Sequence, residues 1–226
     1  MAYARRTLCG KQRLIVGYPV SELERRELNM TTLQKNREKT RKLVVTSMLS
    51  AVSVVLGVTP LGIIPIGPLG VTTLHLPAII GAILEGPIVG AIVGLVFGLV
   101  SLYRTVTTGS ILAPIMLNPM VSVLPRILIG PATYYALRGM EKLTKKHALS
   151  IGTAAACGTL TNTVGVMGFI YIFYAQTYAE AMEISVSAVG STILGVCLTN
   201  GIPEIIAAVI IAVAVCMAVL HIKRRN

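Results

Sequence analysis

In the stretch TTLHLPAIIGAILEGPIVGAIVGLVFGLVSLY, residues 72–103, Glu85 is the one residue from the set Asp, Glu, Lys and Arg. A Gly-Pro pair at Gly86-Pro87 divides it into two apolar runs, residues 72–86 and 87–103, because such a pair interrupts regular structure. A helix needs about 20 apolar residues to cross the hydrocarbon layer of a bilayer. We interpret the two runs as consecutive transmembrane helices, hinged at the Gly-Pro pair.

The composition of the whole chain agrees with a membrane protein. Hydrophobic residues make up 54% of the 226 residues and charged residues 13%, whereas soluble domains carry about 25% charged residues. This low charge excludes a water-facing domain, and the high hydrophobicity excludes a disordered chain, which needs low hydrophobicity. The bilayer is therefore the expected solvent.

Four further apolar runs lie outside the opening stretch, at residues 43–59, 119–137, 151–174 and 187–222. The last is expected to be interrupted at residues 200–203, where Asn-Gly-Ile-Pro breaks the pattern. The Gly- and Pro-rich residues 60–70 are too broken to form a helix. The predicted fold is an all-α integral membrane bundle of six transmembrane helices within a membrane domain at residues 35–226.

The basic residues predict the orientation of this bundle. Lysine and arginine number 20 against nine acidic residues, and they collect at the ends of apolar runs. Such placement indicates membrane orientation and excludes nucleic acid as a partner. With both termini in the cytoplasm, twelve of the basic residues near span ends lie inside, and Arg104 alone lies outside. Both termini are therefore predicted to be cytoplasmic.

Residues 1–34 are polar and contain one short apolar patch, which is too short for a signal-peptide core. They fit two interpretations: a disordered N-terminal tail, or a segment upstream of the true start, since Met30 opens a plausible shorter chain.

Small residues recur every four positions on two predicted helices. Gly86, Gly90, Gly94 and Gly98 share one helical face, and Ser47 and Ala51 share another. Close backbone approach drives helix association in lipid, so such faces favour helix packing. For the glycines we expect packing within the chain. For Ser47 and Ala51, packing within the chain and docking of a second membrane subunit both remain open.

Polar side chains form one stripe on each of the last three predicted helices. A charge at mid-bilayer costs about 2.5–3.5 kcal/mol on insertion scales, so it needs a partner or a wet cavity. Two interpretations remain: an Arg126–Glu204 ion pair that stabilises the bundle, or a solute pocket open to the outside, to which His75 at the outer end of its helix would also contribute. The residues predicted to line the pocket are His75, Asn118, Ser122, Arg126, Asn162, Asn200 and Glu204.

Signatures of an enzyme are missing from the chain. It contains no Walker A motif, no HExxH and no GxSxG, and aspartate is absent altogether. The cysteines show no CxxC pair or zinc-ligand spacing. We predict no catalytic residues, no metal site and no cofactor.

The chain resembles the substrate-binding S components of energy-coupling factor (ECF) vitamin transporters. The resemblance covers residues 35–225 and is carried by EKTRKLVVTSMLSAVSVVLG (38–57), by IPIGPLGVTTLHLPAIIGAILEGPIVGAIVGLVFGLVSL (64–102) and by the basic C-terminal tail. The middle stretch is the most specific part.

The resemblance implies a multi-pass protein of the prokaryotic plasma membrane that binds a water-soluble vitamin from outside. Its partners would be a transmembrane coupling subunit and, through it, two cytoplasmic ATPases. The small-residue face of the first helix, which contacts the coupling subunit in this family, would fall on Ser47 and Ala51.

The interior arginine favours a ligand that bears a carboxylate, such as pantothenate, because opposite charges offset each other's desolvation. That preference disappears if Glu204 already neutralises Arg126. Cobalamin, riboflavin and queuosine precursors also remain open. Two other classes of function are a small membrane enzyme acting on lipid, for which His75 and Glu204 would be the catalytic pair, and a passive channel or scaffold.

Overall fold

The computed structural model describes the backbone of residues 14–15, 18–59, 62–66, 69–109, 111–144 and 146–225. It describes the side chains of residues 33–59, 62, 72–109, 111–144 and 146–222. The chain divides into two compact units, Met1–Leu43 and Val44–Asn226. The first contains a hairpin of β1 (Leu14–Ile15) and β2 (Tyr18–Pro19) and the beginning of α1 (Val20–Val58). The two interpretations of residues 1–34 stay predictions, and residues 1–13 and 16–17 lie outside the described residues.

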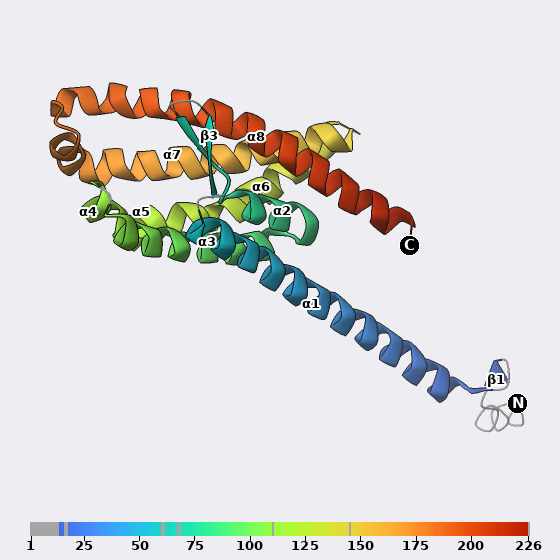
Figure 1. Ribbon diagram of the computed structural model, residues 1–226. Coiled ribbons are helices and arrows are strands. Elements are labelled where there is room, and N and C mark those ends of the chain that lie inside the picture. Colours follow the sequence, from blue (N-terminus) through green and yellow to red (C-terminus); the bar gives the residue numbers. More distant parts are fainter. Residues whose placement is uncertain are drawn as a thin grey trace, which may run out of the picture. The chain divides into compact units, whose positions relative to one another are not determined.

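The second unit is built mainly from helices (Figure 1). Five helical segments of the described chain are long and apolar enough to cross a membrane, which confirms the predicted all-helical membrane class. The helices that follow α1 are α2 (Leu76–Glu85), α3 (Pro87–Thr108), α4 (Ala113–Met116), α5 (Pro119–Ser122), α6 (Leu124–Leu143), α7 (His147–Ala181), η2 (Val186–Ala188) and α8 (Val189–Arg225).

Helix α2 is shorter than the five helical segments that are long enough to cross a membrane. Its ten residues span about 15 Å, half the thickness of the hydrocarbon layer. It follows an antiparallel hairpin of β3 (Ile63–Ile66) and β4 (Leu69–Thr72), in which Ile63 lies opposite Thr72. The prediction that residues 60–70 do not form a long helix is confirmed for the described part of that segment. The hairpin then leads directly into the start of α2.

The predicted interruption of the last helix at residues 200–203 is wrong. Helix α8 continues through Pro203 without a break. A proline removes only one backbone hydrogen bond, whereas unwinding a turn would leave several backbone groups unpaired in an apolar surrounding. The departure from helical geometry lies in α7 instead, where Tyr174 has a φ of −134°.

Three glycines of α3 bring its backbone against α6. A methyl group on Gly94 would lie 2.2 Å from the carbonyl oxygen of Arg126, and one on Gly98 would lie 2.9 Å from Cα of Val123. Gly90 meets Gly130 in the same way. The predicted packing of these glycines within the chain is confirmed, and we call this contact the glycine seam.

Gly86, the fourth glycine of the predicted face, does not belong to the seam. No heavy atom lies within 4 Å of the position that its Cβ would occupy. Its φ of +106° instead allows the chain to turn sharply between α2 and α3. Residues other than glycine rarely adopt this backbone conformation.

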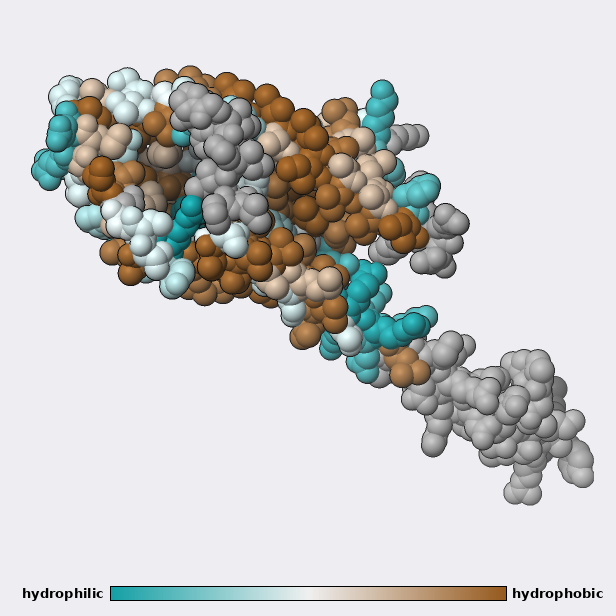
Figure 2. Space-filling model, viewed as in Figure 1, coloured by the Kyte–Doolittle hydropathy of each residue, from teal (hydrophilic) through white to brown (hydrophobic). Residues whose placement is uncertain are grey.

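Apolar side chains fill two clusters inside the second unit. One joins α2, α3, α6, α7 and α8, and includes Ile79, Val93 and Ile129. The other joins the short helices α4 and α5 to α7 and α8, and includes Ile115 and Ile170. Figure 2 shows that apolar side chains also cover much of the visible outer face of the helices, while polar side chains gather where α4 and the turn between α7 and α8 lie. A surface of this kind fits a lipid surrounding.

Candidate functional site

The interior of the helix bundle contains a set of buried polar side chains. Five of the seven residues predicted to line a pocket are among them, and these five are turned away from the apolar exterior. The buried polar residues from the segment before α2 to the end of α8 are Thr73, His75, Thr105, Ser122, Arg126, Thr133, Ser150, Thr159, Asn162 and Glu204. The two other predicted residues, Asn118 and Asn200, are half-buried.

The carboxylate of Glu204 on α8 ties three elements together. Its Oε1 accepts hydrogen bonds from the backbone N–H of Thr72, at 3.1 Å, and from the hydroxyl of the same residue. Its Oε2 accepts a third from the hydroxyl of Thr163 on α7, at 3.4 Å. The end of the β3–β4 hairpin is thereby fixed to α7 and α8 within the bundle.

His75 lies just before α2 and is almost fully buried. Its Nε2 lies 3.1 Å from the hydroxyl of Thr159 on α7. Thr159 itself donates to the carbonyl oxygen of Ala155, so in this arrangement the histidine Nε2 is the donor of the shared hydrogen bond. The other ring nitrogen, Nδ1, is then an acceptor, and it has no partner among the described residues.

Arg126 on α6 does not form the ion pair with Glu204 that was one of the two interpretations. Its Nη1 donates to the carbonyl oxygen of Val121 at 2.7 Å, and its guanidinium lies 5.6 Å from the centre of the Phe97 ring. Neither partner carries a charge, and no carboxylate of the described side chains pairs with it. The side chain is 7% exposed, so an uncompensated cation is held inside the bundle.

Four buried polar atoms of this interior lack a hydrogen-bond partner among the described residues: His75 Nδ1, Arg126 Nε, Thr133 Oγ1 and Asn162 Oδ1. His75 lies against the part of α7 that carries Asn162, because Thr159, the partner of His75, precedes Asn162 by three residues on that helix. On the neighbouring helix, Pro125 packs against Gly165, one turn from Asn162. Buried polar groups in folded proteins are nearly always paired. Unpaired atoms of this kind indicate a position where a polar ligand or water would bind.

Asn118 and Ser122 already have partners in the chain. The side-chain oxygen of Asn118 caps α5 by accepting from the N–H of Met120, and its amide donates to the hydroxyl of Tyr174 at the distortion of α7. Ser122 donates to the carbonyl oxygen of Met116. The side chain of Asn200 forms no hydrogen bond with a described residue, and its role stays a prediction.

Thr72, Phe97, Thr159 and Thr163 belong to this network but were not predicted from the sequence as site residues. Thr72 reaches Glu204 because the β3–β4 hairpin places it beside α8. Phe97 lies next to Arg126 because the glycine seam brings α3 against α6. The spacing of polar residues along a single helix carries no signal for either contact.

Comparison with known proteins identifies the family. The family model described as the ECF transporter, substrate-specific component, matches residues 41–216. This chain belongs to that family. Among its relatives are a pantothenic acid transporter PanT of Lactococcus lactis, 30% identical over 70% of this chain and 81% of the relative, and a pantothenate transporter PanT of Leuconostoc mesenteroides, 30% identical over 84% and 97%.

Family membership establishes the class of function. The protein is a multi-pass S component of the cell membrane, which binds a substrate for uptake and is not an enzyme. The interpretations as a lipid-modifying enzyme and as a passive channel or scaffold are therefore wrong. S components in general work with a membrane coupling subunit and ATPases.

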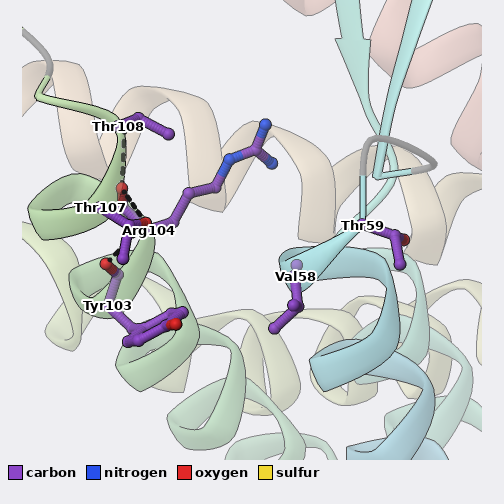
Figure 3. A pocket seen from close by; sticks show the side chains of 7 residues that line it. Val58, Thr59, Tyr103, Arg104, Thr107 and Thr108 are labelled. Carbon is purple, nitrogen blue, oxygen red and sulfur yellow. Dashed lines mark hydrogen bonds between the residues drawn. The ribbon is translucent and has the colours of Figure 1, made fainter.

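The S component also has a cavity of about 380 Å³ between the ends of α1 and α3 (Figure 3). The described residues that line it include no aspartate, glutamate or lysine. The lining residues are Gly57, Val58, Thr59, Tyr103, Arg104, Thr107 and Thr108.

The predicted docking residues Ser47 and Ala51 lie on an exposed face of α1. Ser53 and Gly57 on the same helix are buried, and a methyl group on Gly57 would collide with Val100 of α3. Within the second unit, α1 therefore packs through its Ser53–Gly57 side and leaves the Ser47–Ala51 side uncovered.

Proposed function

We propose that this S component captures pantothenate, or another vitamin that bears a carboxylate, in the interior lined by His75, Arg126, Asn162 and Glu204. The observation that carries the proposal is the buried guanidinium of Arg126, which has an aromatic ring and a carbonyl oxygen as neighbours but no carboxylate. A ligand carboxylate would neutralise it and would accept from its unpaired Nε. The printed names of the two relatives, both pantothenate transporters, support the same ligand.

The other residues of the site take different roles in this proposal. His75 Nδ1 and Asn162, each with an unpaired atom, bind the hydroxyl and amide groups of the ligand. Glu204 already accepts three hydrogen bonds and holds the hairpin in place at the site. Asn118 and Ser122 shape the neighbouring turn, and Asn200 lies four residues before Glu204 on the same helix.

We include in the proposal six membrane crossings with both termini in the cytoplasm. Helix α2 serves as the second crossing although it is only ten residues long, because it is surrounded by protein and its first seven residues are buried. A segment shielded from lipid does not need the length of a lipid-facing helix. The site then lies toward the exterior, and the exposed Ser47–Ala51 face binds the coupling subunit of the ATPase-bearing complex.

The role of Arg126 is tested by calorimetric titration of the purified protein with pantothenate and with its uncharged alcohol analogue, pantothenol. We expect the wild-type protein to bind the acid and to bind the alcohol far more weakly. Arg126→Gln should weaken pantothenate binding at least 30-fold, since removing one partner of a buried charge pair costs about 2–5 kcal/mol. Arg126→Lys keeps the charge and should bind with intermediate affinity.

The same titrations can contradict the proposal. Equal affinity of the wild-type protein for the acid and the alcohol, or unchanged binding of the acid by Arg126→Gln, would refute a carboxylate contact at Arg126. Thermal unfolding of each variant without ligand shows whether a loss of binding reflects a loss of folding.

A further inference from the structure

The cavity between α1 and α3 is separate from the buried polar interior. Its lining comes from the last turn of α1 and from the last two turns of α3, and none of the residues that line it contacts Arg126, His75 or Glu204 through a hydrogen bond. A volume of about 380 Å³ is within the range of small-molecule sites. The cavity can therefore hold a small organic molecule in its own right.

The guanidinium of Arg104 is the charged group of this cavity. Figure 3 shows its side chain extending from α3 across the space toward the end of α1. It is half-buried and makes no hydrogen bond or ion pair with a described residue. The hairpin residues 63–71, which precede Thr72, include no acidic residue in the sequence that could neutralise it.

The threonine hydroxyls of the cavity are already engaged as donors. Thr108 donates to the carbonyl oxygen of Arg104 at 2.8 Å, and Thr107 lies within hydrogen-bond distance of the carbonyl oxygens of Tyr103 and Arg104. Thr59 donates to the carbonyl oxygen of Val55. These hydroxyls satisfy the ends of their own helices, so the Arg104 guanidinium is not needed for that purpose. Its N–H groups remain as the side-chain donors for a ligand.

The position of Arg104 in the sequence also indicates an anion-binding role. In the proposed orientation it is the one basic residue among those near the span ends that lies outside, where lysine and arginine are disfavoured. A cation at such a position that also faces a cavity is suited to bind an anion.

We propose that this cavity is a second anion site, in which Arg104 binds the carboxylate of a small organic acid at the outer face before the acid reaches Arg126. The ordering of the two sites rests on the proposed function and orientation, whereas the cavity and the guanidinium, which pairs with no described residue, do not. The apolar wall formed by Val58 and the ring of Tyr103 would contact the carbon skeleton of the acid.

The experiment uses a fluorescent reporter in the cavity. The protein contains no tryptophan, and Tyr103 is exposed, so Tyr103→Trp introduces a single emitter beside Arg104. Pantothenate is added to purified full-length protein that carries this change alone, or together with Arg104→Gln, Arg104→Lys or Arg126→Gln. Pantothenol serves as the uncharged control ligand, and thermal unfolding confirms the fold of each variant.

We expect saturable emission changes with pantothenate and none with pantothenol. Arg104→Gln should raise the apparent Kd at least tenfold, whereas Arg104→Lys and Arg126→Gln should leave it within about threefold. A titration that is unaffected by Arg104→Gln, that disappears with Arg126→Gln, or that shows no emission change at all would overturn the second site. If calorimetry finds no binding at Arg126 but the Arg104-dependent signal persists, the proposed function fails and the cavity site stands.

Discussion

At the scale of single residues, the two charged side chains inside the bundle differ in how completely they are hydrogen-bonded. Glu204 accepts three hydrogen bonds from two threonines, whereas Arg126 donates to one carbonyl oxygen and leaves Nε unpaired. The carboxylate is thus part of the protein's own hydrogen-bond network. The guanidinium is the group that gains most from a ligand of opposite charge.

Substitution of Glu204 should separate a positioning role from a ligand contact. Glu204→Ala leaves the N–H of Thr72 without its acceptor, which costs about 1–3 kcal/mol when a buried group is left unpaired. We expect a lower temperature of unfolding and faster hydrogen exchange at the Thr72 amide. Glu204→Gln keeps one oxygen acceptor and should show a smaller change in both.

Glu180→Ala is the matched control, because Glu180 is exposed on α7. If Glu204→Ala leaves the exchange of the Thr72 amide at the wild-type rate, the hairpin is held by something other than Glu204.

Sequence reasoning could reach the burial of His75, Arg126, Asn162 and Glu204, because polar residues in apolar helices are forced toward the interior. It could not decide between an Arg126–Glu204 pair and two separate groups. That choice depends on where Thr72 and Phe97 fall in space, and both come from elements far away in sequence.

At the scale of elements, the glycine seam joins α3 and α6 with almost no side-chain volume between them. The spacing of Gly90, Gly94 and Gly98 predicted this contact, since small residues four apart on a helix favour close approach. The continuity of α8 through Pro203 was not predictable in the same way. A proline in a sequence marks the loss of one hydrogen bond, and the surroundings decide whether the helix ends there.

Alanine substitution of two glycines tests the seam. In Gly94→Ala the new methyl group would lie 2.2 Å from the carbonyl oxygen of Arg126, so the two backbones must separate. We expect a loss of about 1–3 kcal/mol in the free energy of unfolding, as for other overpacked positions, together with weaker ligand binding at Arg126. Both are measured by thermal unfolding and calorimetry.

Gly139→Ala on α6 is the control for this change. No atom lies within 4 Å of its Cβ position, so stability should stay the same or rise by about 0.5–1 kcal/mol. Equal effects of the two substitutions would contradict a packing role specific to Gly94.

At the scale of the whole molecule, the proposed function assigns the S component two surfaces that do not overlap: the polar interior for the substrate and the exposed Ser47–Ala51 face of α1 for the coupling subunit. Family membership is what links them, because an S component binds its substrate and works with a coupling subunit. The sequence indicated both surfaces, but the small-residue spacing alone left both docking and packing within the chain open for Ser47 and Ala51.

Ala51→Trp should block assembly and leave capture intact. A tryptophan at the exposed Ala51 prevents close approach of a partner helix. We expect copurification with the coupling subunit to fall at least tenfold, while the affinity for pantothenate stays within about twofold. Ile210→Trp, on an exposed position of α8, should change neither quantity. Normal copurification of the Ala51→Trp protein would place the coupling subunit elsewhere.

The glycine seam also restricts how the protein can respond when its ligand arrives. Two helices whose backbones touch have no rotamers to exchange, so α3 and α6 are expected to move as a single rigid body. Rearrangement must then occur across the other contacts, at the distorted turn of α7 beside Tyr174 or at the hairpin that Glu204 fastens. Phe97 on α3 and Arg126 on α6 would then move as one unit. The contact between the guanidinium and the aromatic ring is therefore expected to persist when the other helices move.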